Sequence, residues 1–227
     1  MLRDALLVAA VYVYVFALIS VGEALRRRGW DPRVTRRLIH LFAGDAILIL
    51  PLFSSWYWPA LIPIGLGVLM TIAFMKRVGF LASPMVESED EVLHVYGPVY
   101  YIISILILVA VLFDDPLTVV ASVFVMAWGD GAAAILAPKL KRRHMYPWSD
   151  KSIEGSSIVF AFSLAAMVFT QAVMKAAYGV SASSPVVFTL AGAATAAVAE
   201  AMAAGPLRHF DNFTVPLITA LILHLVG

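Results

Sequence analysis

Residues 116–137 read PLTVVASVFVMAWGDGAAAILA, a run of apolar and small residues with a single charge at Asp130. A run of about 20 apolar residues has the length that a helix needs to cross the hydrocarbon core of a bilayer. An ionisable group inside such a helix is costly and indicates a functional site by default. The small residues from Gly129 to Ala134 would also suit close helix packing, but packing does not require a carboxylate. The stretch therefore predicts a membrane helix that carries a candidate site residue.

The rest of the chain has the same character. It is 62% hydrophobic and 14% charged, with a mean hydropathy of +0.90, whereas a soluble domain is about half apolar and a quarter charged. We therefore expect an all-α, polytopic integral membrane protein whose residues 1–227 form a single transmembrane catalytic domain. About eight transmembrane helices are expected, or seven and a half-helix because the last segment is short. The expected segments are roughly 4–25, 38–54, 56–75, 98–113, 116–137, 156–175, 185–204 and 213–226.

Lysine and arginine are distributed unevenly between the loops. Of the 16 such residues, 14 lie in 26–37, 76–97, 138–155 and 205–212. Loops with an excess of positive charge lie on the cytoplasmic side of membrane proteins. We therefore expect a multi-pass protein of a prokaryotic cell membrane, with both termini external and the site at the cytoplasmic face. The net charge of +1 gives no indication of a nucleic-acid partner, and the absence of cysteine excludes thiolate nucleophiles, disulfides and Cys-ligated metals.

A second feature follows the Asp130 helix: Lys151-Ser152-Ile153-Glu154-Gly155-Ser156-Ser157. Glycine lets the backbone approach a ligand closely, and Ser156 or Ser157 can cap the next helix, whose free N–H groups favour an anion. Glu154 fits a phosphate site only if a divalent cation lies between the two. The basic residues just before this stretch are explained by the charge bias of cytoplasmic loops.

Polar residues also occur at the expected inner ends of other segments. Arg37 and His40 are three residues apart, so they share a helical face. His40 is a candidate base, although a structural pair with Asp45 would explain it too. Glu200 lies inside an apolar segment without an evident structural reason, while Asp211 fits the N-cap of the last helix. Because the external ends carry no such groups, these residues together predict a membrane-embedded enzyme that handles phosphate at the inner interface.

Four motifs resemble one family. They are Arg37-x-x-His40, Gly129-Asp130-x-x-Ala133, Lys151-Ser152-x-Glu154-Gly155-Ser156 and Asp211-Asn212-x-Thr214-Val215-Pro216-Leu217. In this order, over residues 36–217, the chain resembles the dolichol kinase, phytol kinase and polyprenol kinase family, which is related to phosphatidate cytidylyltransferases. The Lys-Ser-x-Glu-Gly element is the most specific of the four.

The resemblance implies transfer of a phosphoryl group from CTP to the hydroxyl of a membrane isoprenoid alcohol, such as geranylgeraniol, phytol, a polyprenol or dolichol. A Walker-A pattern is absent from the sequence. The resemblance further implies that Asp130, Glu154 and Glu200 hold Mg²⁺, and that His40 or a carboxylate orients or deprotonates the hydroxyl. The expected catalytic residues are Asp130, Lys151, Glu154 and His40, and the expected nucleotide-binding residues are Arg37, Lys139, Lys151, Ser152, Gly155, Ser156, Asp211 and Asn212.

Two other functions use similar residues. In a CDP-lipid synthase, a lipid phosphate would attack the α-phosphate of CTP and pyrophosphate would leave. A transporter would also carry buried acids, but along a path to the outside instead of at one face. The small residues of 191–204 could pack within the fold or against a second copy of the chain.

Overall fold

The computed structural model describes residues 1–75, 97–203 and 210–227. Within these ranges the chain is helical apart from turns, short loops and one isolated β-bridge between Met145 and Ser152. The all-α prediction is therefore confirmed for the described residues. Three of the basic residues behind the predicted topology, Lys76, Arg77 and Arg208, lie outside them.

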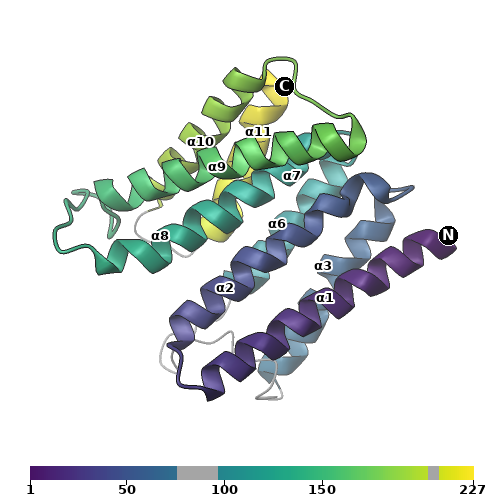
Figure 1. Cartoon of the computed structure of the whole chain (residues 1–227), viewed down its shortest axis with the longest axis horizontal. Helices are drawn as coiled ribbons and strands as arrows, with labels where there is room; N and C mark the ends of the chain where they lie inside the picture. The colour runs from purple at the N-terminus through teal and green to yellow at the C-terminus, as the bar shows by residue number, and fades with distance from the viewer. Residues whose placement is uncertain (76–96, 204–209) are drawn as a thin grey trace.

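The helices follow the predicted apolar segments one by one (Figure 1). Two of the rods change helix type along their length, the second into a 3-10 helix and the fifth through a π-helix. In chain order they are α1 (Leu2–Arg27), α2 (Pro32–Gly44) with the 3-10 helix η1 (Asp45–Leu52), α3 (Tyr57–Met75), α6 (Gly97–Leu112), α7 (Pro116–Phe124) with the π-helix η3 (Val125–Asp130), α8 (Gly131–Leu136) and the 3-10 turn η4 (Ala137–Lys139), α9 (Ile153–Tyr178), α10 (Pro185–Ala201) and α11 (Asp211–Val226).

Three of these rods are long and apolar enough to cross a membrane: Leu2–Arg27, Pro116–Lys139 and Ile153–Tyr178. Four further apolar helices are shorter, namely Tyr57–Ile72, Pro98–Leu112, Pro185–Ala201 and Asp211–Val226. Large apolar side chains are exposed on the outer helices, for example Val13, Val111 and Val168. A surface of this kind suits a bilayer. Membrane character thus agrees with the prediction, and the number of spans stays a prediction.

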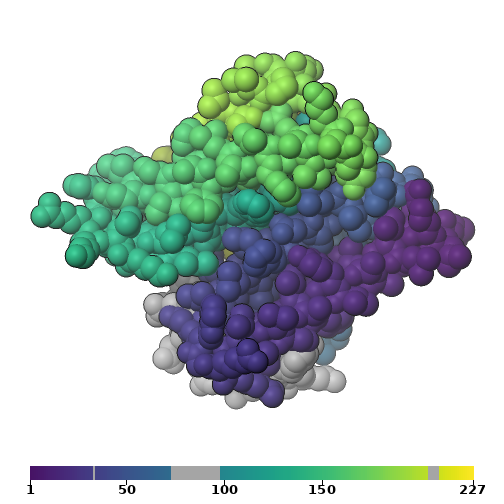
Figure 2. All heavy atoms as spheres, viewed as in Figure 1, coloured from purple at the N-terminus to yellow at the C-terminus, as the bar shows by residue number. Residues whose placement is uncertain are grey.

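The rod formed by α7, η3, α8 and η4 is the centre of the fold. In its most apolar stretch 78% of the residues are buried, against 22% in α1. In the view of Figure 2, α9 and α2 leave little of α7 visible. Gly129 lets α9 approach closely, because a Cβ atom at this position would lie 2.5 Å from Ser163 Oγ. The charge predicted at Asp130 therefore belongs to the most enclosed helix and does not face lipid.

Both termini are tied to turns between helices. Asp4 pairs with the amino group of Met1 at 3.0 Å and accepts a hydrogen bond from the Ser54 N–H at 2.8 Å. His224 Nδ1 lies 2.8 Å from Asp115 Oδ2 in the turn before α7. In Figure 1 the termini lie towards the right and top, away from the loop 140–152 at the left. This arrangement is compatible with termini on one side of the membrane and the basic loop on the other.

The helices form two groups that meet along α2 and α11. The first group contains α1, α2, α3 and α6, and the second contains the central rod with α9, α10 and α11 (Figure 1). Contacts of α2 with α8 and η3, and of α11 with α6, join the groups. The candidate site lies at this junction.

Candidate active site

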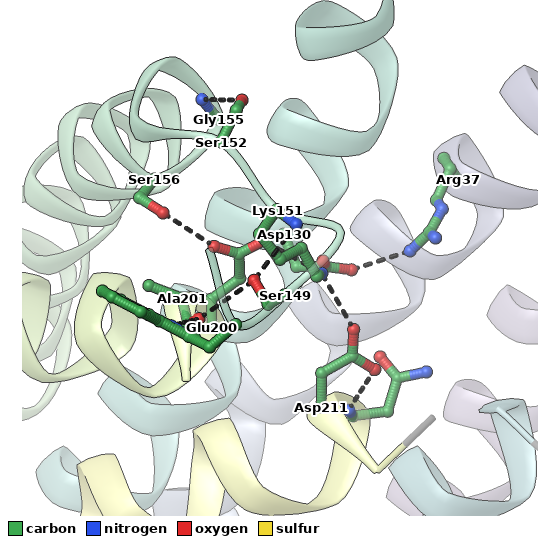
Figure 3. Close-up of polar contacts among 12 residues, drawn as sticks. Arg37, Asp130, Ser149, Lys151, Ser152, Gly155, Ser156, Glu200, Ala201 and Asp211 are labelled. Atoms are coloured by element: carbon green, nitrogen blue, oxygen red, sulfur yellow. Dashed lines mark hydrogen bonds and ion pairs between the residues drawn. The ribbon is translucent and has the colours of Figure 1, made fainter. Parts of the chain in front are cut away.

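Five helices and the loop before α9 bring six polar side chains together, and we call this set the polar cluster (Figure 3). Hydrogen bonds and ion pairs connect residues that are up to 93 positions apart in the chain. The members are Arg37 from α2, Asp130 from η3, Lys151 from the loop before α9, Ser156 from α9, Glu200 from α10 and Asp211 from α11.

Asp130 is the last residue of the π-helix η3. A π-turn contains one more residue than an α-turn and is often found at functional sites. The Asp130 carboxylate accepts a hydrogen bond of 2.7 Å from Arg37 Nη1, and the two side chains are 6% and 25% exposed. Because both groups are largely removed from water, the pair compensates charges that would be costly to bury alone.

Lys151 connects two further carboxylates. Its Nζ lies 2.9 Å from Glu200 Oε1 and 3.3 Å from Asp211 Oδ2. Burial disfavours the charged ammonium, but the carboxylates of Asp211, Asp130 and Glu200 outweigh this effect and raise the pKa of Lys151 above its usual value. The other oxygen of Glu200 accepts a hydrogen bond of 3.1 Å from Ser156 Oγ. Lys151 is therefore a permanent, positioned cation.

The loop before α9 is folded back on itself, which places Lys151. Backbone hydrogen bonds run from Tyr146 N–H to the Lys151 carbonyl at 3.0 Å and from Ile153 N–H to the His144 carbonyl at 2.9 Å. Side chains of Trp148 and Ser149 donate to the Ala201 carbonyl at the end of α10, at 3.3 and 3.4 Å. The loop is thus attached to the helix that carries Glu200.

The cap of α9 differs from the predicted one. Ser152 is the N-cap, and its Oγ accepts a hydrogen bond of 3.1 Å from the Gly155 N–H. Ser156, the predicted cap, binds Glu200 instead, and Ser157 Oγ donates to the Ile153 carbonyl at 2.8 Å. Several serines occur within one turn, so spacing alone could not select between them.

Two predicted site residues lie outside the polar cluster. The Glu154 carboxylate accepts a hydrogen bond of 2.9 Å from the His144 N–H, and its other oxygen lies 2.5 Å from His144 Nδ1. Lys139 is exposed at the end of η4. In this structure Glu154 and Asp130 do not form the predicted metal-binding pair, because both oxygens of the Glu154 carboxylate are hydrogen-bonded to His144.

Carboxylates suit Mg²⁺, which prefers oxygen ligands and commonly takes one or two carboxylates together with substrate phosphates. Glu200 and Asp211 approach the same ammonium group, and Asp130 also acts on it electrostatically. Within residues 1–75, 97–203 and 210–227, no group of three or more His, Asp or Glu side chains is arranged to hold a metal by itself. The donor set therefore fits a cation that arrives with phosphate oxygens.

A cavity begins beside the polar cluster and extends between α1, α2 with η1, α3 and α6. Its walls are apolar except at one end, where Arg36, Arg37, His40, Tyr101 and Asn212 line it. The rings of His40 and Tyr101 pack with their centroids 4.2 Å apart. His40 Nε2 and the Tyr101 hydroxyl are buried, and neither has a hydrogen-bond partner among the described residues.

The structure also decides the open question about His40 and Asp45. Asp45 accepts a hydrogen bond of 3.1 Å from Trp128 Nε1, so it does not form a structural pair with His40. The sequence analysis missed Tyr101, although a hydroxyl within an apolar segment is a usable signal. The π-helix at Val125–Asp130 was not predicted from the sequence either.

Comparison with known proteins identifies relatives of the chain. The chain is 33% identical over 218 residues to a phytol kinase of Synechocystis sp., covering 92% of this chain and 86% of that protein. It is 28% identical to a probable phytol kinase 2, chloroplastic, of Oryza sativa (92% and 72% covered), and 27% identical to a probable phytol kinase, chloroplastic, of Triticum aestivum (100% and 78%). No protein-family model and no solved structure matches. The chain therefore belongs to the phytol and polyprenol kinase family, whose members are membrane phosphotransferases acting on lipid alcohols.

Proposed function

We propose that this enzyme transfers the γ-phosphoryl group of CTP, with Mg²⁺, to the hydroxyl of an isoprenoid alcohol of the phytol or geranylgeraniol type. The observation that carries the proposal is the polar cluster beside the end of an apolar cavity. A soluble nucleotide and a lipid alcohol can meet only where a charged site adjoins an apolar one. The relatives named phytol kinase support the acceptor class.

Phosphoryl transfer depends mainly on positioning and on neutralising charge. Lys151 and Arg37 would bind the β- and γ-phosphate oxygens, since both are cations at the polar cluster. Ser152, Gly155 and Ser156 at the start of α9 are further proposed phosphate contacts. To donate to a phosphate, the N–H groups of Gly155 and Ser156 would first have to leave the Ser152 side chain and carbonyl. Asp211 and Asn212 at the start of α11 complete the proposed nucleotide site.

Asp130 and Glu200 are the proposed ligands of Mg²⁺, which when bound would neutralise charge on the transferred phosphate. Both carboxylates are buried, with side-chain exposures of 6% and 5%, and both lie beside the cations that would bind phosphate. Each would exchange its Arg or Lys partner for the incoming ligand. Glu154 stays a predicted ligand that would first have to leave His144.

In the proposed reaction, the alcohol oxygen forms a bond to the γ-phosphorus while the bond to the β–γ bridging oxygen breaks, so CDP leaves. The hydroxyl proton passes to a base, and His40 is the proposed base. Its Nε2 lines the cavity near its polar end and is free of other hydrogen bonds among the described residues. A neutral imidazole nitrogen of this kind can accept the proton.

The site is proposed to face the cytoplasm, with both termini outside. The uneven distribution of Lys and Arg supports this orientation. Cysteines introduced singly at residue 2 and at residue 142 would test it, because the native chain contains no cysteine. A membrane-impermeant thiol reagent applied to whole cells should label the first site and not the second; the reverse pattern would contradict the orientation.

Two labelled forms of CTP test the reaction. Purified protein in lipid nanodiscs with Mg²⁺ and geranylgeraniol or phytol should move label from the γ-position to the lipid and none from the α-position. In a parallel reaction with a lipid phosphate such as phosphatidate, transfer of the α-label to the lipid with release of pyrophosphate would identify a CDP-lipid synthase. Absence of any lipid product with CTP, ATP, GTP or UTP would overturn the kinase proposal, and ATP used at the same rate as CTP would overturn the donor assignment.

A further inference from the structure

The cavity in the first helix group has a polar end and an apolar end. Arg37, His40 and Tyr101 mark the polar end, whereas Leu50 and Phe53 lie at the far end. Along α6 the lining extends from Pro98 to Val109, a rise of roughly 17 Å at 1.5 Å per residue. The cavity is thus long and polarised along the helix axes.

We propose that this cavity binds the isoprenoid chain of the acceptor, with the hydroxyl at His40 and Tyr101, and that the residues around Leu50 set the longest chain accepted. The inference rests on the proposed kinase function. It adds the location of the isoprenoid chain of the substrate and the residues that limit the length of that chain.

Two observations select a single lipid alcohol as the occupant. Apart from the polar end, the walls are made of Ile, Val, Leu, Ala, Pro, Met, Phe and Gly side chains, which cannot bind a charged or sugar-like ligand. At the polar end, two buried polar atoms, His40 Nε2 and the Tyr101 hydroxyl, have no partner among the described residues. Buried polar groups are normally hydrogen-bonded, so these atoms point to a ligand with one hydroxyl.

The polar end also adjoins the proposed phosphate site. Arg37 lines the cavity and at the same time binds Asp130 of the polar cluster at 2.7 Å. One helical turn separates Arg37 from His40 on α2. A hydroxyl held at His40 would therefore lie next to a phosphate held at Arg37, as transfer between them requires.

Residues along α2 and η1 lie at increasing distances from the proposed position of the substrate hydroxyl at His40. Ala43 follows His40 by one turn, Ala46 by nearly two, and Leu50 lies near the far end of the cavity. A bulky side chain at Ala43 should block every chain, and one at Leu50 should block only long chains. Small-to-large changes that point into existing space are better tolerated than those in a packed core.

The experiment compares two alcohols in the full-length protein in nanodiscs: geraniol, with two isoprene units, and geranylgeraniol, with four. Leu50→Phe should lower kcat/KM for geranylgeraniol by at least about tenfold relative to geraniol. Ala43→Phe should abolish activity with both. Val111→Phe, on the outer face of α6 and 73% exposed, is the matched control and should change neither.

A second measurement separates this inference from the kinase proposal. Binding of each alcohol without nucleotide, measured as a thermal shift of each variant, should show the same length dependence. If no nucleotide supports phosphorylation but binding follows this pattern, the cavity assignment holds and the kinase proposal fails. If phosphorylation occurs and Leu50→Phe leaves the ratio of the two alcohols unchanged, in rate and in binding, the cavity assignment is wrong.

Discussion

The two helix groups differ in how their polar side chains are satisfied at the junction where the groups meet. In the second group, Lys151, Glu200 and Asp211 are charges that burial would make costly alone, and each is stabilised by the others. In the first group, the cavity wall is apolar except at one end, where His40 Nε2 and the Tyr101 hydroxyl lack hydrogen-bond partners among the described residues. The polar cluster is therefore complete without a ligand, whereas the cavity is not. Substitutions should disturb the first through charge and the second through shape.

The largest effect is expected from Asp130→Asn. This change leaves Arg37 buried opposite a neutral amide and removes a proposed Mg²⁺ ligand, so activity should fall by about a thousandfold. The measurement is lipid phosphorylation at saturating Mg²⁺. Asp45→Asn is the control, because an amide oxygen can still accept the hydrogen bond from Trp128 Nε1. Equal activity losses in both variants would contradict the special role of Asp130.

Lys151→Met should lower activity by several hundredfold and also destabilise the protein, since Glu200 and Asp211 would then face each other without a cation. Breaking a buried pair by removing one partner typically costs about 3–5 kcal/mol. Adding Glu200→Gln should restore part of the thermal stability and none of the activity. If the double variant regains both, the role of Lys151 is purely structural. Lys175→Met, at an exposed position near the other end of α9, serves as the control.

His40→Gln tests the proposed role of His40, which lies where the cavity meets the polar cluster. Loss of the proposed base should lower kcat by about a hundredfold while leaving the KM for CTP unchanged. Tyr101→Phe removes only the neighbouring hydroxyl and should have a smaller effect. A raised KM for CTP with unchanged kcat would place His40 in the nucleotide site instead.

The smallest effect is expected from Glu154→Gln. Its carboxylate is paired with a His144 side chain that is 77% exposed, and solvent-exposed pairs of this kind contribute little to stability. Glu200→Gln, at 5% exposure, should raise the Mg²⁺ concentration needed for half-maximal rate, and Glu154→Gln should not. A larger Mg²⁺ requirement in Glu154→Gln than in Glu200→Gln would restore the metal role predicted from the sequence.

The helices could be predicted from the sequence because an apolar run of this length has few possible structures other than a helix. The one-sided distribution of charge also predicted that Arg37, Asp130, Lys151 and Asp211 belong together, and the structure brings these side chains into one cluster. Membrane proteins concentrate polar groups where function needs them, so such groups stand out against an apolar background.

Partner choice could not be predicted in the same way. Glu154 and Glu200 are equivalent in type, but the folded-back loop gives the first to His144 and leaves the second to Lys151. For a similar reason the N-cap of α9 is Ser152 and not Ser156 or Ser157, and Ser156 binds Glu200. The cavity was not predicted because three of the helices that enclose it, α1, α3 and α6, are apolar on nearly every side, and no periodic pattern distinguishes the faces that line it.

The π-helix at Val125–Asp130 makes the direction of one carboxylate depend on how many residues precede it. One additional residue in a turn rotates everything after it by about 100° relative to an uninterrupted α-helix. Because this turn already holds one residue more than an α-turn, a second inserted residue, such as an alanine after Met126, should turn Asp130 away from Arg37, although the charge and apolar character of the rod would hardly change. At this point in the chain, the number of residues matters more for the direction of Asp130 than their identity. A variant with every functional side chain intact would therefore still be inactive.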